Sequence, residues 1–192
     1  MIEGYKILEL AVGSGSALDT VLYDSESSSG DEVDLIEQAA AAGATTRAVT
    51  PAVLSCVSAR SGPLGCVAAV SVAETRLTQL RLSGNPLLMV AEALEKPGNL
   101  GSLARTASAA GADALIAVDS STDVFAPAAL HASLGAVFAL PVVRCSSRQA
   151  LAWMHDRGIA VVATSPAGRS AYYELDLARP LAVAVGNEYR GL

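Results

Sequence analysis

The chain has 192 residues, 52% of them hydrophobic and 17% charged, which excludes extensive disorder and allows one large or two small domains to bury a core. The formal net charge of −6 argues against indiscriminate binding to nucleic acid. No run approaches the roughly 18 uninterrupted apolar residues of a membrane helix, and the first residues lack the pattern of a signal peptide. With three cysteines outside CxxC spacing and two histidines, the sequence predicts reduced thiols, no metal site, no membrane contact and a cytoplasmic protein.

The first half of the chain alternates short helices with short strands. Apolar spacing and glycine or proline breaks predict helix 4–12, strand 20–23, helix 31–42, strand 45–49, helix 50–59 and strand 65–72. In the third of these elements, Asp31 is the expected helix cap. This order predicts a small N-terminal α/β domain over residues 1–76. A polar segment that closes with Ser83-Gly84-Asn85 predicts a linker over residues 77–85.

From residue 86 on, apolar strands again alternate with helices. The predicted elements are strand 86–93, helix 99–110, strand 114–119, helix 127–134, strand 137–143, helix 146–157, strand 159–163 and strand 181–185. Strands joined through helices are most economically parallel, so residues 86–192 are expected to form an α/β domain around a parallel sheet. Residues 1–84 hold five Lys/Arg against ten Asp/Glu, and residues 85–192 hold eight against nine. The second half is therefore nearly neutral.

The helix after the strand at 86–93 consists mostly of small residues. Asn99 is a candidate N-cap for it, and Gly111 stands where a C′ glycine is expected. Arg105 places a full charge in the middle of this helix. On this stretch alone, Arg105 fits an ordinary solvated helix face.

A second pattern, at the end of the chain, changes that interpretation. The patterns Asn99-x-Gly101-x-x-x-Arg105-Thr106-Ala107 and Gly186-Asn187-Glu188-x-x-Gly191-Leu192 resemble, in this order, the first and second motifs of the SpoU (TrmH-type) RNA ribose methyltransferases. These enzymes belong to the SPOUT superfamily. The intervening segments 132–136 and 140–144 are also similar to the family, and the resemblance runs from about Pro86 to the end of the chain.

The resemblance implies a fold, an activity and a cofactor. The fold is a small L30e-like α/β domain, which binds RNA substrate, followed by a SPOUT-type parallel-sheet domain. The activity is transfer of a methyl group from S-adenosyl-L-methionine to a ribose 2′-hydroxyl of rRNA or tRNA. The partners are RNA and a second copy of the chain, because the family is dimeric with its active site near the subunit interface.

The same resemblance assigns roles to individual residues. It gives catalytic roles to Arg105, Asn99 and Glu188. Loops at the carboxyl ends of parallel strands are where an α/β sheet binds such ligands, and cofactor-binding roles are expected there for Gly186, Asn187, Thr164 and Leu192. RNA-binding roles are expected for Lys96, Arg105, Ser133 and Arg190. A guanidinium is a poor base at neutral pH, so we expect Arg105 to hold a phosphate and to stabilise the developing alkoxide. Glu188 either anchors its own loop through backbone N–H groups or takes part in the chemistry. Gly186 is expected to let the backbone approach the cofactor closely.

One family feature has no counterpart before Leu192. The third motif, a Pro-Met strand followed by a Ser-Leu-Asn-Val-Ser helix, is missing, so the family's trefoil knot is expected to be incomplete. We therefore expect a fragment or a truncated gene product. It would bind the cofactor poorly and be prone to aggregate at exposed strand edges.

Other functions receive less support from the residues. A non-catalytic RNA-binding module, or an inactive fragment of such an enzyme, remains the main alternative because the third motif is absent. The stretch Gly13-Ser14-Gly15-Ser16 lacks the third glycine of a dinucleotide fingerprint and follows a predicted helix instead of a strand. No Gly-Lys-Ser/Thr follows Gly98 and Gly101, so this stretch is not a P-loop.

Overall fold

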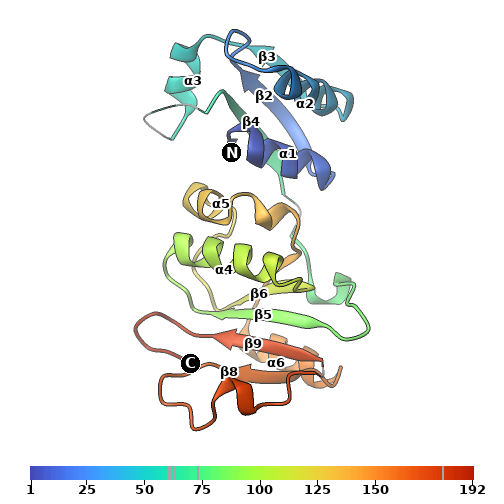
Figure 1. The fold of residues 1–192 in the computed structure, drawn as a ribbon, viewed down its shortest axis with the longest axis vertical. Coiled ribbons are helices and arrows are strands. Elements are labelled where there is room, and N and C mark those ends of the chain that lie inside the picture. The colour runs from blue at the N-terminus through green and yellow to red at the C-terminus, as the bar shows by residue number, and fades with distance from the viewer. Residues whose placement is uncertain (60–61, 63, 73, 179) are drawn as a thin grey trace. The chain divides into compact units, whose positions relative to one another are not determined.

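The structure is a computed structural model, and it describes residues 1–59, 62, 64–72, 74–178 and 180–192. The chain divides into two compact units, residues 1–73 and 74–192, and each unit has its own sheet (Figure 1). The α/β fold with a parallel sheet in the second half is confirmed. In the part of the chain that the structure describes, no helix is both long and apolar enough to cross a membrane.

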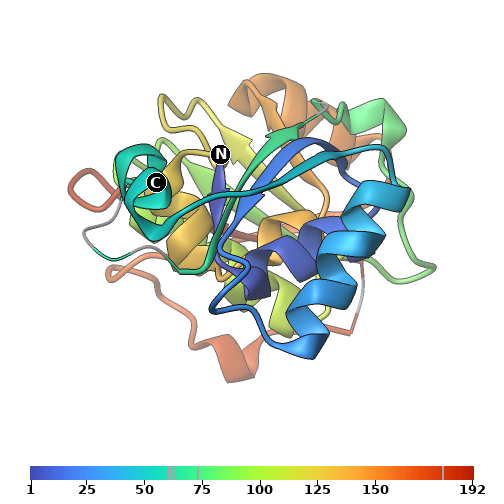
Figure 2. The same cartoon turned by 90° about the horizontal axis from the view of Figure 1, so that it is seen from above.

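The N-terminal unit is built on a mixed sheet with strand order β1-β4-β2-β3. Its strands are β1 (Ile2–Glu3), β2 (Ala17–Tyr23), β3 (Thr45–Ala48) and β4 (Cys66–Ser71), and its helices are α1 (Tyr5–Gly13), α2 (Gly30–Ala41) and α3 (Pro51–Val57). Strand β2 is parallel to β3, whereas β4 is antiparallel to both β1 and β2. Helices α1 and α2 pack side by side, as Figures 1 and 2 show.

Two details of this unit differ from the prediction. Helix α2 starts before Asp31, because Ser29 is its N-cap and the Ser29 N–H donates to the Glu32 carboxylate at 2.6 Å. Strand β1 was not predicted, since two residues carry no periodic pattern. It exists because Ile2 pairs with Ala68 of β4, a contact remote in sequence.

The second unit holds five parallel strands in the order β7-β6-β5-β9-β8. The strands are β5 (Leu87–Glu92), β6 (Ala114–Val118), β7 (Val142–Cys145), β8 (Ala160–Ala163) and β9 (Leu181–Val185). The helices are α4 (Pro97–Ala109), α5 (Pro127–Ser133) and α6 (Ser147–His155), with short 3-10 turns η1 (Leu77–Gln79), η2 (Ala136–Phe138) and η3 (Tyr172–Glu174).

Helices cover both faces of this sheet. Helices α4 and α5 lie together on one face and α6 lies on the other (Figure 1). On the α6 side, alternating strand side chains pack against the inner face of the helix. The strands contribute Leu88, Val90, Ile116, Val118, Ala182 and Ala184, and the helix contributes Ala150, Trp153 and Met154. All five residues of β6 are buried, which is why this strand reads as a continuous apolar run.

Two further predictions for this unit are wrong. The expected strand at 137–143 is the turn η2 followed by β7, because Leu134 and Gly135 both adopt left-handed backbone angles and break the extended chain. Part of the expected linker is not a free connection. Leu77, Leu80 and Leu82 pack against the core of the second unit, so this stretch belongs to that unit.

Candidate functional site

Two loops meet at the carboxyl ends of the neighbouring strands β5 and β9. The first loop begins at Ala93, whose φ of 49° lies in the left-handed region that a residue with a side chain rarely adopts. The second loop is a closed turn, in which Asn187 and Gly191 exchange backbone hydrogen bonds of 3.1 and 3.0 Å. In a parallel α/β sheet, ligands bind beyond the carboxyl ends of the strands. A ligand site is therefore expected at the junction of these two loops.

Asn187 ties the two loops together. Its Nδ2 donates to the Ala93 carbonyl at 2.8 Å and to the Glu95 carboxylate at 3.2 Å. Its Oδ1 accepts the backbone N–H groups of Tyr189 at 2.9 Å and Arg190 at 3.1 Å. A side-chain amide has two donor hydrogens and two acceptor lone pairs, so these four bonds use its whole capacity. The Asn187 side chain therefore organises the loops and has no hydrogen-bonding capacity left for the cofactor contact expected of it.

Asn99 and Glu188 form a second link between the same loops. Asn99 Nδ2 donates to Glu188 Oε1 at 2.7 Å, and the Glu95 N–H lies 3.5 Å from Glu188 Oε2. Asn99 is free to do this because it is not the N-cap. That position belongs to Lys96, whose carbonyl accepts the Asn99 N–H at 3.0 Å. Two of the three expected catalytic residues are thus in direct contact.

The Glu188 carboxylate is stabilised in its charged form. Its pKa is lowered, first by a hydrogen bond from its own backbone N–H and then by the Asn99 amide, with smaller contributions from the N–H groups of Glu95 and Lys96. A general base works best with a pKa near the operating pH. The environment of Glu188 therefore favours an anchoring carboxylate over a base.

Arg105 lies on a different face of α4. It follows Asn99 by six residues, a rotation of about 600° at about 100° per residue, so the two side chains lie about 120° apart around the helix. Gly101, one turn before Arg105, packs against Ala129 of α5, so Arg105 lies toward the α5 side of α4. The Arg105 side chain is exposed. One copy of the chain therefore does not direct Arg105 toward the Asn99–Glu188 pair.

The close approach permitted by Gly186 is to the chain itself. A Cβ on Gly186 would overlap the backbone of Gly191 and lie 2.5 Å from the Leu192 nitrogen. The glycine is thus required by the closed turn, which is a different reason from the expected contact with a cofactor. The Thr164 hydroxyl donates to the Ala184 carbonyl at 2.9 Å and extends the pairing of β8 with β9.

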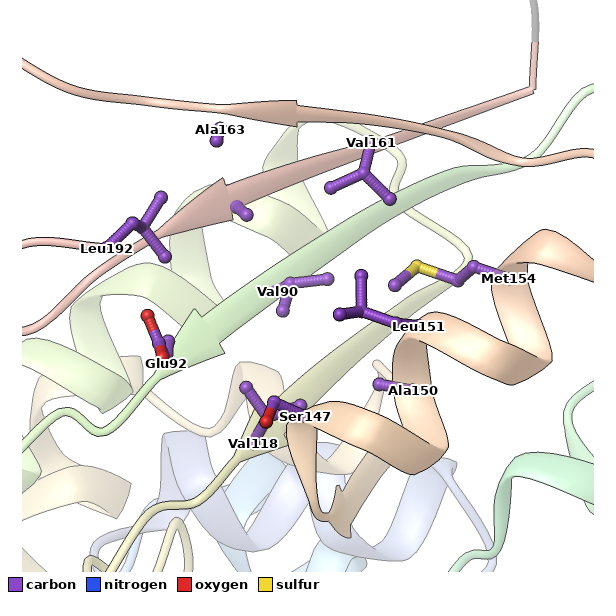
Figure 3. Close-up of a pocket in the computed structure, with 11 residues that line it drawn as sticks. Val90, Glu92, Val118, Ser147, Ala150, Leu151, Met154, Val161, Ala163 and Leu192 are labelled. Atoms are coloured by element: carbon purple, nitrogen blue, oxygen red, sulfur yellow. The ribbon is translucent and has the colours of Figure 1, made fainter.

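An apolar pocket of about 220 Å³ lies between α6 and the sheet (Figure 3). Its walls come from β5, β6, β8, β9 and α6, and Leu192 closes one end. The Glu92 carboxylate and the Ser147 hydroxyl are its polar lining groups. Thr164 directly follows the lining residue Ala163. Apolar walls with a few polar groups suit a ligand that combines a flat heterocyclic ring with hydroxyl groups beside it.

The expected RNA-binding residues separate into two groups. Lys96, Arg105 and Arg190 are exposed, and the Lys96 ammonium lies 5.4 Å from the ring centroid of Tyr189. Ser133 is fully buried, and its hydroxyl donates to the Leu130 carbonyl and accepts the Gly135 N–H. This placement gives Ser133 a structural role at the end of α5, which corrects the expected contact with RNA.

Sequence reasoning missed two participants, Ala93 and Glu95. No residue pattern signals a left-handed alanine, although the position of Glu95 before Lys96-Pro97 was visible as a carboxylate at the end of a strand. Among the described residues, no group of three His, Cys, Asp or Glu side chains could hold a metal ion.

Comparison with known proteins places the site in context. The family model described as the SpoU rRNA Methylase family matches residues 86–192. The chain is 29% identical to a Streptomyces viridochromogenes protein named 23S rRNA (uridine(2479)-2'-O)-methyltransferase. This alignment covers the whole chain and 69% of the relative. The chain is also 27% identical to the Bacillus subtilis 23S rRNA (guanosine(2553)-2'-O)-methyltransferase RlmP. This alignment covers the whole chain and 73% of RlmP.

Solved structures give the same picture. One similar structure is the crystal structure of the SpoU methyltransferase AviRb from Streptomyces viridochromogenes in complex with the cofactor AdoMet. The match covers 99% of this chain and 74% of the AviRb chain, with a TM-score of 0.88 and 28% sequence identity. A second is the crystal structure of the AdoMet-bound rRNA methyltransferase from Sinorhizobium meliloti. That match covers 99% of this chain and 71% of the other chain, with a TM-score of 0.87 and 29% sequence identity.

Proposed function

Because the chain belongs to the SpoU rRNA methylase family, we propose that it transfers a methyl group from S-adenosylmethionine to a ribose 2′-hydroxyl of ribosomal or transfer RNA. The observation that carries this proposal is the Asn99–Glu188 hydrogen bond, which joins the first and second motifs at the carboxyl ends of β5 and β9. The names of the full-length relatives support the same reaction.

The pocket beside α6 supports binding of the cofactor's adenosyl group. Its apolar walls suit the faces of the base, and the Glu92 carboxylate is an acceptor for hydroxyl or amino groups. Leu192 lines this pocket, and Thr164 and Gly186 follow its lining strands β8 and β9. S-adenosylmethionine supplies a methyl group activated by its bond to a positively charged sulfur.

The residues of this chain position the ribose and stabilise charge. A C–O bond forms at the 2′-oxygen while the C–S bond breaks, and the hydroxyl proton leaves to solvent. Arg105 is a poor base but a good partner for developing negative charge on that oxygen and for the neighbouring phosphate. Glu188, with its lowered pKa, holds the turn 187–191 against Asn99.

We propose a homodimer in which Arg105 of one copy acts beside the Asn99–Glu188 pair of the other. The support is geometric, since Arg105 and Asn99 lie about 120° apart around α4 within one chain and therefore on different faces of the helix. A second copy related by a two-fold axis can bring the two groups together. An RNA substrate of this kind would also place the protein in the cytoplasm.

The test is methyl incorporation from labelled S-adenosylmethionine into total rRNA and tRNA. We expect Arg105→Ala to reduce incorporation by about 100-fold or more, the effect of losing one group that stabilises a transition-state charge, with the melting temperature unchanged. Full activity of Arg105→Ala would contradict its role. A folded, cofactor-binding wild-type protein that transfers no methyl group would favour a non-catalytic RNA-binding module.

Mixing two inactive variants tests the shared site. If Arg105→Ala and Glu188→Ala subunits exchange freely, half of the dimers are mixed and each has one intact site, so about a quarter of the wild-type activity should return. Activity that stays at the level of the separate variants would place both residues in one subunit's site.

A further inference from the structure

We propose that Tyr189 and Lys96 form a platform on which an unpaired RNA base stacks beside the methyl-transfer site. The inference rests on the proposed function, because it assigns a substrate contact to the same site. It concerns Tyr189, a residue to which neither motif resemblance nor the contacts of the site gave a role.

The exposure of the Tyr189 ring is the first observation. The residue is 74% exposed, although an aromatic ring of this size usually buries most of its area. Tyr172 and Tyr173 are similarly exposed, but their rings contact each other edge-on, with centroids 5.5 Å apart. Tyr189 instead lies under the Lys96 ammonium, 5.4 Å from the ring centroid. The ring therefore offers a face on which a base can stack, and the neighbouring ammonium offers a positive charge for a phosphate.

Both residues have fixed backbones. The Tyr189 N–H donates to Asn187 Oδ1 at 2.9 Å inside the closed turn. The Lys96 carbonyl accepts the N–H groups of Asn99 and Leu100, at 3.0 and 3.2 Å, as the N-cap of α4. The side chains are exposed while their attachment points are held, so little backbone freedom is lost when a ligand binds. This is preorganisation of a binding surface.

The position of the platform points to the substrate. Tyr189 is adjacent in sequence to Glu188, and Lys96 lies three residues before Asn99, so the Asn99–Glu188 hydrogen bond joins the two halves of the platform. A base stacked on Tyr189 would belong to the nucleotide that is modified or to its neighbour. Sequence-specific RNA recognition mostly targets unpaired nucleotides, whose bases are free to stack on aromatic side chains.

The charge of the chain favours stacking over general attraction to phosphate. The segments 95–99 and 187–191 carry Lys96 and Arg190 against Glu95 and Glu188, so they are neutral together. A neutral loop pair in a chain of net charge −6 gains little from the field of the RNA backbone. Stacking between a base and an aromatic ring needs no net charge, and the single Lys96 ammonium is available for one phosphate.

The experiment measures RNA binding and methyl transfer separately, with the full chain. Binding of a fluorescein-labelled, single-stranded oligoribonucleotide is followed by anisotropy, and the KM for rRNA is taken from methyl incorporation. We expect Tyr189→Ala to weaken RNA binding and raise the RNA KM by about tenfold, while Tyr189→Phe stays within about twofold because the ring is kept. Lys96→Ala should weaken RNA binding. It should also make the RNA affinity less dependent on salt concentration, by the amount that one phosphate contact contributes.

Tyr172→Ala is the matched control, since it removes a similarly exposed tyrosine from the turn η3. The proposal is overturned if Tyr189→Ala and Tyr172→Ala behave alike, or if Tyr189→Ala changes the melting temperature or oligomeric state but not the RNA affinity. Wild-type protein that does not bind the oligonucleotide also overturns it. If Tyr189 governs RNA binding but wild-type protein transfers no methyl group, the platform stands and the proposed reaction fails.

Discussion

At the junction of the two loops, the Asn187 side-chain amide makes four hydrogen bonds while only 7% of the residue is exposed. Replacing it with alanine leaves the Ala93 carbonyl and two backbone N–H groups without their partners. We expect Asn187→Ala to lower the free energy of unfolding by about 1–3 kcal/mol, measured by urea denaturation. Asn99→Ala is the control, because Asn99 is exposed and should cost less than about 0.5 kcal/mol. Equal losses in the two variants would show that Asn187 does not hold the loops.

Glu188 provides a pH test of the same junction. Its pKa in the folded protein is lowered by its own N–H and by the Asn99 amide, so the ionised form is favoured by folding. The resulting stabilisation is present above the unfolded-state pKa and is lost as pH falls through the lower folded-state pKa. It is small, because the carboxylate is exposed to solvent. We expect NMR titration to find the pKa of the Glu188 carboxyl below the usual glutamate range. The substitution Asn99→Ala should raise that pKa. A Glu188 pKa that Asn99→Ala leaves unchanged would contradict the 2.7 Å Asn99–Glu188 hydrogen bond as a cause of the lowered pKa.

Helices α4 and α5 pack through a glycine at their contact. A Cβ on Gly101 would overlap the carbonyl oxygen of Ala129 and lie 2.9 Å from its carbonyl carbon. The α5 backbone cannot yield as a flexible side chain would, so the helices must move apart. We expect Gly101→Ala to destabilise the protein by about 1–3 kcal/mol, measured by thermal or urea unfolding.

Gly98 is the matched control in the first turn of the same helix. Nothing lies within 4 Å of a Cβ built there, and its backbone is helical. Gly98→Ala should therefore be neutral or stabilise by up to about 1 kcal/mol, since alanine loses less chain entropy in a helix. A Gly101→Ala variant as stable as Gly98→Ala would mean that α4 and α5 are not held at this distance.

The elements that sequence could predict are those with a strong local pattern. The parallel strands and the helices of the second unit follow from apolar runs and from proline at the first helical position. The start of α4 was misplaced because Asn99 is a good N-cap by type, yet Pro97 begins the helix and leaves the Asn99 amide for Glu188. The strand predicted at 137–143 failed because two successive left-handed residues, Leu134 and Gly135, redirect the chain.

The site was predictable in its residues but less so in its contacts. Motif resemblance identified Asn99 and Glu188, and the structure joins them. It could not show that the Asn187 amide is fully used within the protein, or that Gly186 accommodates its own chain. Such facts depend on which distant backbone groups meet, and a single sequence carries no local signal for them.

At the scale of the whole molecule, the two units differ in charge. Residues 1–73 contain three Lys/Arg against nine Asp/Glu, a net charge of −6, and residues 74–192 contain ten of each and are neutral. The entire net charge therefore belongs to the N-terminal unit, for which an L30e-like role in RNA binding is predicted. A field of this sign repels phosphates, so that unit would have to recognise RNA by local contacts instead of by its overall charge.

This distribution sets the expected salt dependence of RNA binding. If Lys96, Arg105 and Arg190 each neutralise one phosphate and the N-terminal unit neutralises none, the logarithm of the binding constant should fall with the logarithm of salt concentration with a slope of about −2. The measurement is anisotropy of a labelled single-stranded RNA titrated at several potassium chloride concentrations. A slope steeper than about −5 would require more phosphate contacts than these three cations provide, and would show that other Lys or Arg side chains of the chain also contact phosphate. A slope near −2 that falls to about −1.4 in Lys96→Ala would instead leave stacking as the larger part of the affinity, because so few phosphates are neutralised.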